Sequence, residues 1–240
     1  MIRWRYETAS ECAFILYIDG AIDTQLNQQL STLSKLINER LAPVLIDAVP
    51  SYSSILLSYD ITKISATDMQ RALKSLQDEP LSIPTEAQTK RIYIPVFYSI
   101  ETGEDLERVA QKASMSVEDV IDIHSSTIYN AFALGFAPGF AYLGQVDSRI
   151  ATPRLATPRT QVPKGSVAIA DRQTAVYPAK SPGGWNLIGQ CPIELFNKDQ
   201  APYSLIQPTD QVQFVAIDQS TFKALKADPN SWNLLEGCCV

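Results

Sequence analysis

Hydrophobic positions in the first eighty residues follow strand and helix periods in turn. Residues 2–8 alternate apolar with polar side chains, and residues 12–18 form a short apolar run, so both are predicted strands. Asp23 can cap a helix, because apolar side chains recur behind it at helical spacing, at Leu26, Leu30, Leu33 and Ile37. The beginning of the chain therefore predicts two strands followed by an amphipathic helix.

The same pattern then repeats. Residues 44–48 and 54–59 are predicted strands around a turn at Pro50. Ser65 with Asp68 three residues later is a capping signature, and the helix behind it has an apolar face formed by Met69, Ala72, Leu73 and Leu76. The order ββαββα predicts a small α+β domain, with one sheet and helices on one of its faces.

After residue 90 the chain carries two helix patterns and then mainly strand patterns. Residues 91–98 are a predicted strand and 103–113 a predicted helix, and Ser116 with Asp119 forms a capping box for a second helix. Further predicted strands are 129–134, 166–170, 174–177, 186–191 and 212–217, followed by a short helix over 220–226. A strand-rich segment with few helices predicts a β-barrel.

The segment between these two patterns has no apolar periodicity. Residues 78–89 include Pro80 and Pro84 and are the predicted linker. We therefore divide the chain into an α+β domain over residues 1–85 and a β-barrel domain over residues 86–240.

Glycine and proline are concentrated between residues 135 and 190. Seven of the ten glycines lie there, mixed with prolines and aromatic residues. Glycine permits positive φ and close backbone approach, whereas proline fixes φ and removes a donor. The segment therefore predicts short strands joined by rigid loops with aromatic walls, which is where binding sites usually lie.

Composition narrows the class of protein. The chain is 45% hydrophobic and 19% charged, which is enough for a buried core, and its net charge of −6 disfavours nonspecific nucleic-acid binding. No apolar run approaches the ~20 residues of a membrane span, and no secretory signal stands out. Four cysteines without metal spacing and a single histidine disfavour a zinc site. We expect no nucleic-acid partner, no membrane association, no metal and a cytoplasmic location.

Two Thr-Pro-Arg repeats, continued by Val-Pro-Lys, bring cations together in an acidic chain. Arg154 and Arg159 lie in the repeats, between Arg149 and Lys164, and only Asp147 opposes them nearby. Because arginine binds carboxylate or phosphate bidentately, the pattern predicts an anion-binding rim made rigid by proline, with Arg154 or Arg159 as its ligand. The alternative is a set of solvated turns with one structural arginine–carboxylate pair.

Two loops combine glycine with aromatic residues. The run GFAPGFAY supplies candidate walls for an apolar cleft, namely Phe136, Pro138, Gly139 and Tyr142. The run SPGGW supplies a candidate pocket loop with free N–H groups, namely Pro182, Gly183, Gly184 and Trp185. For both loops the alternative is a tight turn packed into the core.

The single histidine, His124, lies on the apolar face at the end of the second predicted helix of this region. A helix C-terminus favours imidazolium, which could hold an anion or donate a proton, but a lone histidine on an apolar face is also typical of a satisfied core residue. No Ser-His-Asp or Cys-His arrangement follows from the spacing. No Gly-Lys-Ser/Thr phosphate loop exists, so the residues alone give no case for ATP binding by this chain.

The longer motif string resembles one known family. GFAPGFAYLG, TPRTQVPKGSVAIA and YPAKSPGGWNLIGQ are similar to the family of the 5-oxoprolinase B subunit, which is also called KipI or allophanate hydrolase subunit 1. IPVFY, GEDLERVA, VEDVIDIH and PTDQVQF extend the resemblance over nearly the whole chain. One departure is Thr209, which stands before Asp210 where the family usually has glycine.

The resemblance implies a ferredoxin-like N-terminal domain followed by a cyclophilin-like β-barrel. It also implies one component of a bacterial 5-oxoprolinase, which opens 5-oxo-L-proline to L-glutamate with hydrolysis of ATP, together with a related C subunit and a separate A subunit. ATP would then be a cofactor of the complex, and this chain alone would be inactive. In that setting Arg154 and Arg159 would neutralise carboxylate and phosphate, and His124 would donate a proton or hold an anion.

Two other functions remain compatible with the resemblance. One is an inhibitor that binds a sensor histidine kinase and blocks its autophosphorylation. The other is a module related to allophanate hydrolase or urea amidolyase. The identity of the partner distinguishes them, because the first alternative requires a histidine kinase and the metabolic function requires the A and C subunits.

Overall fold

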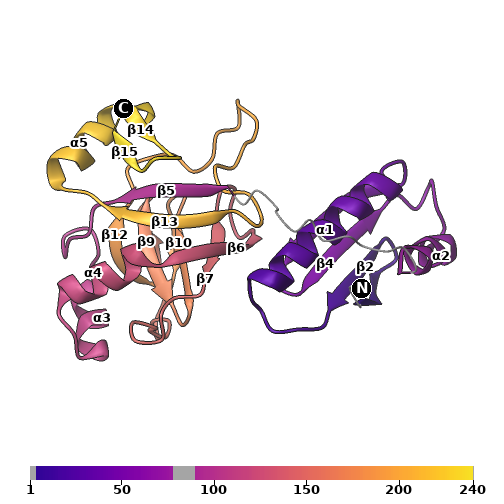
Figure 1. Ribbon diagram of the computed structural model, residues 1–240, viewed down its shortest axis with the longest axis horizontal. Helices are drawn as coiled ribbons and strands as arrows, with labels where there is room; N and C mark the ends of the chain where they lie inside the picture. The colour runs from indigo at the N-terminus through magenta and orange to yellow at the C-terminus, as the bar shows by residue number, and fades with distance from the viewer. Residues whose placement is uncertain (1–3, 78–89, 240) are drawn as a thin grey trace. The chain divides into compact units, whose positions relative to one another are not determined.

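The computed structural model describes residues 4–77 and 90–239, which belong to two compact units, Met1–Gln88 and Thr89–Val240 (Figure 1). The predicted linker, residues 78–89, lies outside the described residues, and so does the predicted domain boundary between residues 85 and 86. No helix within the described ranges is long and apolar enough to cross a membrane.

The first unit is a four-stranded antiparallel sheet with two helices. Its elements are β1 (Trp4–Ser10), β2 (Ala13–Ile18), α1 (Thr24–Leu41), β3 (Leu45–Ser51), β4 (Ser54–Tyr59) and α2 (Ala66–Gln77). The strands pair in the order β1-β2-β4-β3. The predicted order ββαββα is thereby confirmed. The predicted turn at Pro50 is wrong: Pro50 pairs with Ile55 inside the hairpin, and Tyr52, with a φ of 48°, supplies the left-handed turn residue beyond it.

Both helices of this unit pack on the same face of the sheet. Alternate residues of β2 and β4 are buried, and they share one core with the apolar faces of α1 and α2. Asp23 caps α1 as predicted, because its Oδ1 accepts the N–H of Leu26 at 2.9 Å. Phe14 stacks on Tyr59 with ring centroids 5.6 Å apart.

The second unit holds most of the strands. Its elements are β5 (Arg91–Val96), α3 (Leu106–Ala113), α4 (Val117–Ser126), β6 (Ile128–Leu134), β7 (Ala141–Gly144), β8 (Arg159–Val162), β9 (Ser166–Ala170), β10 (Gln173–Val176), β11 (Ser181–Gly183), β12 (Asn186–Gln190), β13 (Gln211–Ala216), α5 (Gln219–Ala227), the 3-10 helix η1 (Pro229–Ser231), β14 (Trp232–Asn233) and β15 (Cys238–Cys239). Five of these strands were not predicted, and each has only two to four residues, too few to show an alternating pattern.

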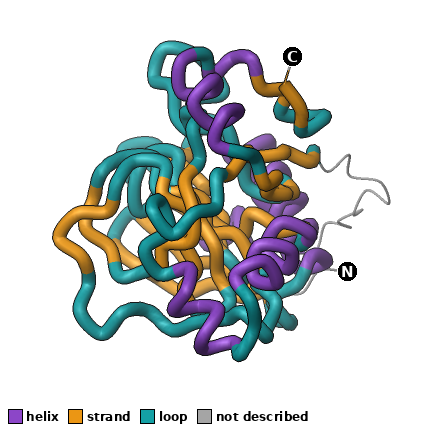
Figure 2. Tube along the Cα trace, turned by 90° about the vertical axis from the view of Figure 1, so that its left-hand side faces the viewer, coloured by secondary structure: helices purple, strands orange, loops and turns teal. Residues whose placement is uncertain are grey.

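One path of paired strands runs through this unit in the order β5-β13-β6-β7-β10-β9-β12. Along this path β5 and β13 pair in parallel and the other pairs are antiparallel, so the fold is a mixed α/β fold dominated by an antiparallel sheet. A closed barrel is not found among the described strands, because the ends of the path meet only at an isolated bridge between Phe97 and Gln190. Loops make many of the connections between strands (Figure 2).

The sheet buries side chains on both of its faces. In β9, Val167 and Ile169 belong to the larger core, whereas Ala168 and Ala170 belong to a smaller cluster with Trp185. This explains why β9 reads as a continuous apolar run rather than an alternating one. The small alanine side chains leave room for aromatic rings, and the candidate site is built on that cluster.

Two local details depart from the sequence pattern. The helix predicted over residues 103–113 begins only at Leu106, because Gly103 lies against β12, where an added Cβ would be 2.2 Å from the carbonyl carbon of Ile188. The turn at Thr209 keeps the left-handed conformation that glycine adopts easily, with a φ of 75°. Strain of this kind costs about 1–3 kcal/mol for a residue with a side chain.

Candidate functional site

Phe140 lies at the centre of an aromatic cluster that extends from the core to the surface. Its ring contacts Tyr142, Tyr177, Trp185 and Phe136 edge-on, with centroids 4.9, 5.5, 5.8 and 5.2 Å away. Phe140 and Trp185 are buried, whereas Phe136 is 62% exposed. The cluster therefore offers an apolar, aromatic wall that reaches solvent at one end.

The loop between β6 and β7 gives this cluster its outer ring. Phe136 has a φ of 74° and Gly139 a φ of 83°, so the loop turns twice through the left-handed region. A Cβ on Gly139 would lie 2.8 Å from the Cβ of Phe196, so only glycine fits there. The loop is closed by a bond of 3.1 Å from the N–H of Gly135 to the carbonyl of Phe140. Of the residues predicted from this loop, Pro138 is exposed and Gly139 is buried.

The SPGGW run forms the opposite side of the cluster. Gly183 is pressed against the hydroxyl of Tyr177, where an added Cβ would lie 2.3 Å from that oxygen. Gly184 accepts the N–H of Leu155 at 2.7 Å, which joins this loop to the Thr-Pro-Arg segment. Pro182 is exposed, and Trp185 is 5% exposed and belongs to the core of the cluster.

Arg154 is the exposed cation of the site. Its guanidinium carbon lies 5.7 Å from the centroid of the Trp185 ring, a cation–π distance, and among the described residues it makes no ion pair. Burial raises the pKa of Tyr177, and a hydrogen bond to the backbone of Trp185 and the positive charges of Arg154 and Arg159 partly offset that rise. Both arginines therefore act electrostatically on the aromatic cluster.

Arg159 has the structural partners that were the alternative for this motif. Its Nη2 lies 2.8 Å from Oδ2 of Asp105, its Nε lies 3.4 Å from Glu104, and its Nη1 donates to the carbonyl of Trp185 at 3.3 Å. The same Asp105 oxygen accepts the N–H of Leu187 at 2.8 Å. Arg159 is thus a clamp between α3 and the Trp185 loop, and its side chain is 21% exposed.

Asn186 anchors the segment that carries Arg154. It is fully buried, and its Nδ2 donates to the carbonyls of Pro153 and Ile169, each at 2.9 Å. Its Oδ1 accepts a hydrogen bond from Arg108 of α3. Helix α3 and the loop before it therefore hold both arginine segments, one through Asp105 and one through Arg108.

Sequence reasoning missed Asp105, Arg108 and Asn186. Asp105 has the position of a helix N-cap, but its side chain makes no capping bond and is turned to Arg159 instead. No local pattern shows such pairs, because their partners lie 54 to 82 residues away. The other two cations lie in solvent as predicted, with Arg149 paired to Asp147 and Lys164 paired to Glu194.

His124 lies in the core rather than at the aromatic cluster. It is fully buried, its Nδ1 is 2.7 Å from the hydroxyl of Tyr98, and its Nε2 is 2.9 Å from the hydroxyl of Thr174. Its ring stacks on Phe214 at 4.6 Å. Burial lowers the pKa of His124 to about 3, so the ring is neutral at physiological pH. A neutral ring with both nitrogens bonded is a satisfied core residue, and it reaches neither an anion nor a substrate in this conformation.

The described ranges contain no group of three or more His, Cys, Asp or Glu residues that could hold a metal ion. The arrangement as a whole combines an aromatic wall, one exposed guanidinium and a set of rigid loops. Such a surface can bind a planar or cyclic compound that carries an anionic group.

Comparison with known proteins first defines the class. The family model described as carboxyltransferase domain, subdomain C and D, matches residues 4–206, which include the aromatic cluster and both arginines. Among curated relatives, the B subunit of 5-oxoprolinase from Bacillus subtilis (strain 168) is 34% identical over 238 residues, covering 95% of this chain and 99% of the relative. The protein of the same name from Escherichia coli O157:H7 is 34% identical over 215 residues, covering 90% and 97%. The chain belongs to the carboxyltransferase-domain family and, within it, to the family of 5-oxoprolinase B subunits.

Solved structures share the fold. TTHA0988 is 34% identical with a TM-score of 0.74, and the match covers 86% of this chain but only 40% of that one. PH0987 from Pyrococcus horikoshii is 43% identical with a TM-score of 0.55, covering 91% and 100%. The Kluyveromyces lactis urea carboxylase has a TM-score of 0.76 at 17% identity, covering 95% of this chain and 23% of its own, and shows likeness of fold alone.

Proposed function

We propose that this chain is the B subunit of a 5-oxoprolinase complex that opens 5-oxo-L-proline to L-glutamate with hydrolysis of ATP. The observation that carries the proposal is the match to two relatives of that name, which spans 99% and 97% of their lengths. Activity belongs to the complex with the A and C subunits, ATP binds at the level of that complex, and this chain alone does not turn over.

The proposed reaction explains why a cation is needed at the site. The lactam oxygen takes the γ-phosphoryl group of ATP, and ADP leaves. Water adds to the activated carbon, the carbon–nitrogen bond breaks to release the amine, and a second water displaces phosphate. Negative charge develops on the phosphoryl oxygens while the substrate carboxylate is already charged, so positive groups fixed in advance stabilise the reacting state.

We assign the anion-binding role in this chain to Arg154, since it is exposed and is held against Trp185 without an acidic partner among the described residues. Arg159 contributes mainly by positioning the Trp185 loop, because its guanidinium is already bound by Asp105 and Glu104. The apolar wall consists of Phe136, Tyr142 and Trp185, with the loops shaped by Pro138, Gly139, Pro182, Gly183 and Gly184.

The finer fold assignments are also proposals. In the first unit, moving β1 to the end of the order would turn ββαββα into β-α-β-β-α-β, the ferredoxin-like arrangement. In the second unit, a sheet whose two ends approach at the bridge between Phe97 and Gln190 is compatible with a cyclophilin-like architecture. Neither assignment is needed for the proposed activity.

The test is reconstitution. The chain is co-expressed with the A and C subunits, and ATP hydrolysis is measured with and without 5-oxo-L-proline, with a mixture lacking only this chain as the control. We expect hydrolysis that depends on 5-oxo-L-proline and on this chain. Full activity of the mixture without it would contradict the proposal. Co-purification of a histidine kinase with no response to 5-oxo-L-proline would instead support the inhibitor function, which the relatives do not favour.

A further inference from the structure

A second recess in this unit lies where the two ends of the strand path separate. Phe97 and Gln190 exchange two backbone hydrogen bonds, of 2.9 and 3.0 Å. Continuing that antiparallel register by two residues would place Pro95 opposite Pro192, and neither has an N–H to donate, so the ladder stops. Beyond this point β5 is bonded to the C-terminal segment instead, with the N–H of Tyr93 donating to Leu234 at 2.8 Å.

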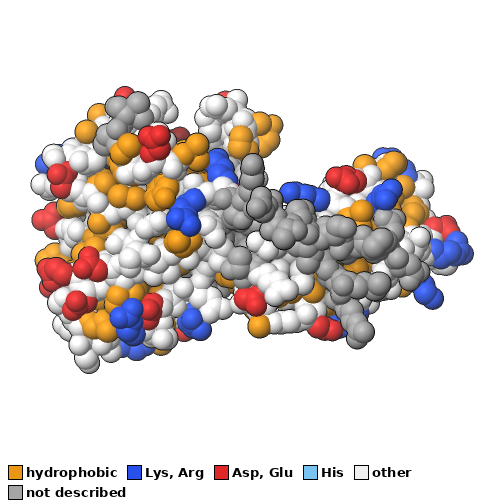
Figure 3. Space-filling model, viewed as in Figure 1, with side chains coloured by type: hydrophobic (Ala, Val, Ile, Leu, Met, Phe, Trp, Pro, Cys, Tyr) orange, Lys and Arg blue, Asp and Glu red, His pale blue; other side chains and the backbone are white. Residues whose placement is uncertain are grey.

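The space opened there is a cavity of about 580 Å³, within the ~300–1,000 Å³ that is usual for small-molecule sites. Figure 3 shows a notch in the surface between two lobes at the top of this unit. The cavity is lined by the loop of residues 193–205 on one side and by residues 229–234 on the other. None of the residues of the aromatic cluster around Phe140 lines it.

Both walls of the cavity are held by their own hydrogen bonds. In the loop of residues 193–205, the N–H of Leu205 donates to Leu195 at 2.9 Å and the N–H of Asn197 donates to Tyr203 at 2.7 Å. In the C-terminal segment, Nε1 of Trp232 donates to the carbonyl of Tyr93 at 2.9 Å. The cavity is therefore preformed, which lowers the ordering cost of binding a ligand there.

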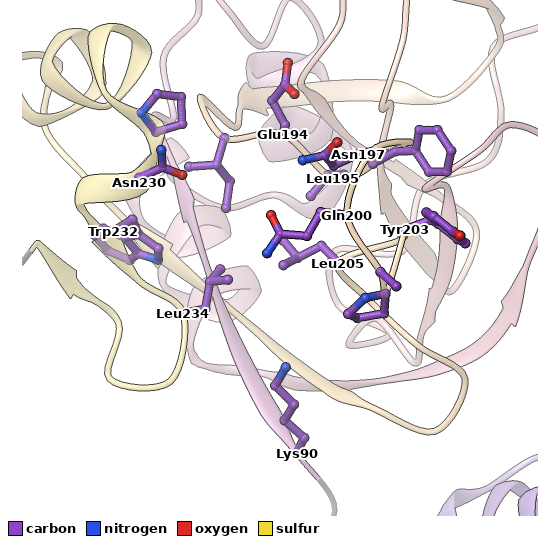
Figure 4. Close-up of a pocket in the computed structure, with 15 residues that line it drawn as sticks. Lys90, Glu194, Leu195, Asn197, Gln200, Tyr203, Leu205, Asn230, Trp232 and Leu234 are labelled. Atoms are coloured by element: carbon purple, nitrogen blue, oxygen red, sulfur yellow. The ribbon is translucent and has the colours of Figure 1, made fainter.

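The groups that line the cavity are complementary to a definite chemistry. Asn197 and Gln200 project from the loop toward the opposite wall, which carries Trp232, while the ammonium of Lys90 is directed toward the same space (Figure 4). Within the described part of the chain, Lys90 and the carboxamides of Gln200 and Asn230 have no hydrogen-bond or ion-pair partner. A lone ammonium binds a carboxylate, and a carboxamide pairs with another amide because each has a donor and an acceptor.

We propose that this cavity binds a small carboxylic acid that also carries an amide. In this arrangement Lys90 contacts the carboxylate, Gln200 and Asn230 contact the amide, and the hydrocarbon body lies against Trp232 and its apolar neighbours. The choice of 5-oxo-L-proline as the probe rests on the proposed function, since it carries a carboxylate and a lactam in one ring. The site itself is argued from the cavity, apart from the aromatic cluster.

The three tryptophans make the binding site directly readable by NMR. Trp232 lines the cavity, Trp185 belongs to the aromatic cluster and Trp4 lies in the first unit. We would label the indole nitrogens of the full chain and titrate with 5-oxo-L-proline. The expected result is a saturable shift of the Trp232 signal. Two analogues serve as controls, 2-pyrrolidinone without the carboxylate and cyclopentanecarboxylate without the amide, and both should bind about tenfold or more weakly.

Substitutions locate the contacts. Lys90→Met should weaken 5-oxo-L-proline about tenfold and leave 2-pyrrolidinone unchanged, whereas Lys112→Met, an exposed lysine of α3 outside the cavity, should change neither. Absence of any Trp232 shift, or a shift confined to Trp185, would overturn this proposal even if the reconstituted complex is active. A Trp232 shift that responds to Lys90→Met would support it even if the complex shows no turnover.

Discussion

Replacing Asp105 with alanine should destabilise the second unit far more than replacing its neighbour Glu104. Both carboxylates contact Arg159, at 2.8 and 3.4 Å. Only Asp105 is buried, however, and only Asp105 also accepts the N–H of Leu187. The two variants therefore compare a buried clamp with a surface ion pair on the same arginine.

The expected magnitude follows from what each substitution leaves behind. Asp105→Ala strands the buried N–H of Leu187, which costs about 1–3 kcal/mol. Loss of the charged bond to Arg159 adds about 1 kcal/mol, a reduced figure because water reaches that partly exposed side chain. The sum is about 2–4 kcal/mol, a large part of a typical stability of about 5–15 kcal/mol. Glu104→Ala should cost about 0–1 kcal/mol, since the Glu104 side chain is 62% exposed.

Urea unfolding followed by tryptophan fluorescence is a suitable assay, because Trp185 and Trp232 both lie in the second unit. With a slope of about 2 kcal/mol per molar urea, Asp105→Ala should lower the midpoint by about 1–2 M, and Glu104→Ala by less than about 0.5 M. Equal midpoints for the two variants would refute the reasoning, since the buried clamp would then contribute no more than a surface pair.

Four further outcomes are expected. Arg154→Ala should lower the activity of the reconstituted complex at least about tenfold, or about 1.4 kcal/mol, with an unchanged unfolding midpoint, and wild-type turnover would remove its anion-binding role. Gly183→Ala should destabilise by about 1–3 kcal/mol through its collision with a buried hydroxyl, whereas Gly184→Ala, whose Cβ would meet its neighbour at an ordinary 3.5 Å, should change the midpoint little. Thr209→Gly should raise the melting temperature by relieving the strain at a φ of 75°. Because burial lowers the pKa of His124 to about 3, the unfolded chain binds the extra proton below pH 6.5, so stability should fall by about 1.4 kcal/mol per pH unit from there downward, and a flat profile of urea midpoints between about pH 6.5 and about pH 5 would contradict this.

Elements with a clear period were predictable from sequence, and those without one were not. The helix after Asp23 and the strand 166–170 followed from apolar spacing and capping. Strands such as β8 are too short to carry a period, and their positions depend on pairing with distant segments. The turn at Pro50 was misplaced because proline is common in turns, whereas here it lies within a paired strand.

The candidate site was predictable in its residue types but not in its partners. The glycine-rich runs indicated loops with aromatic walls, and Phe136 and Trp185 do belong to one cluster. The sequence left open whether Arg159 is free or paired, and its pair with Asp105 depends on a contact 54 residues away. The alternative of a core residue was the correct one for His124, which only its surroundings in three dimensions could decide.

The place of β13 has a consequence for how the chain folds during synthesis. This strand lies between β5 and β6, and its Gln211 pairs with Arg91, 120 residues earlier. Strands β5 and β6 therefore leave the ribosome with unpaired edges and wait for the strand that joins them, while the first unit has no such dependence on late residues. We expect the second unit to be the slow step of folding, and nascent chains that end before residue 211 to be the aggregation-prone species.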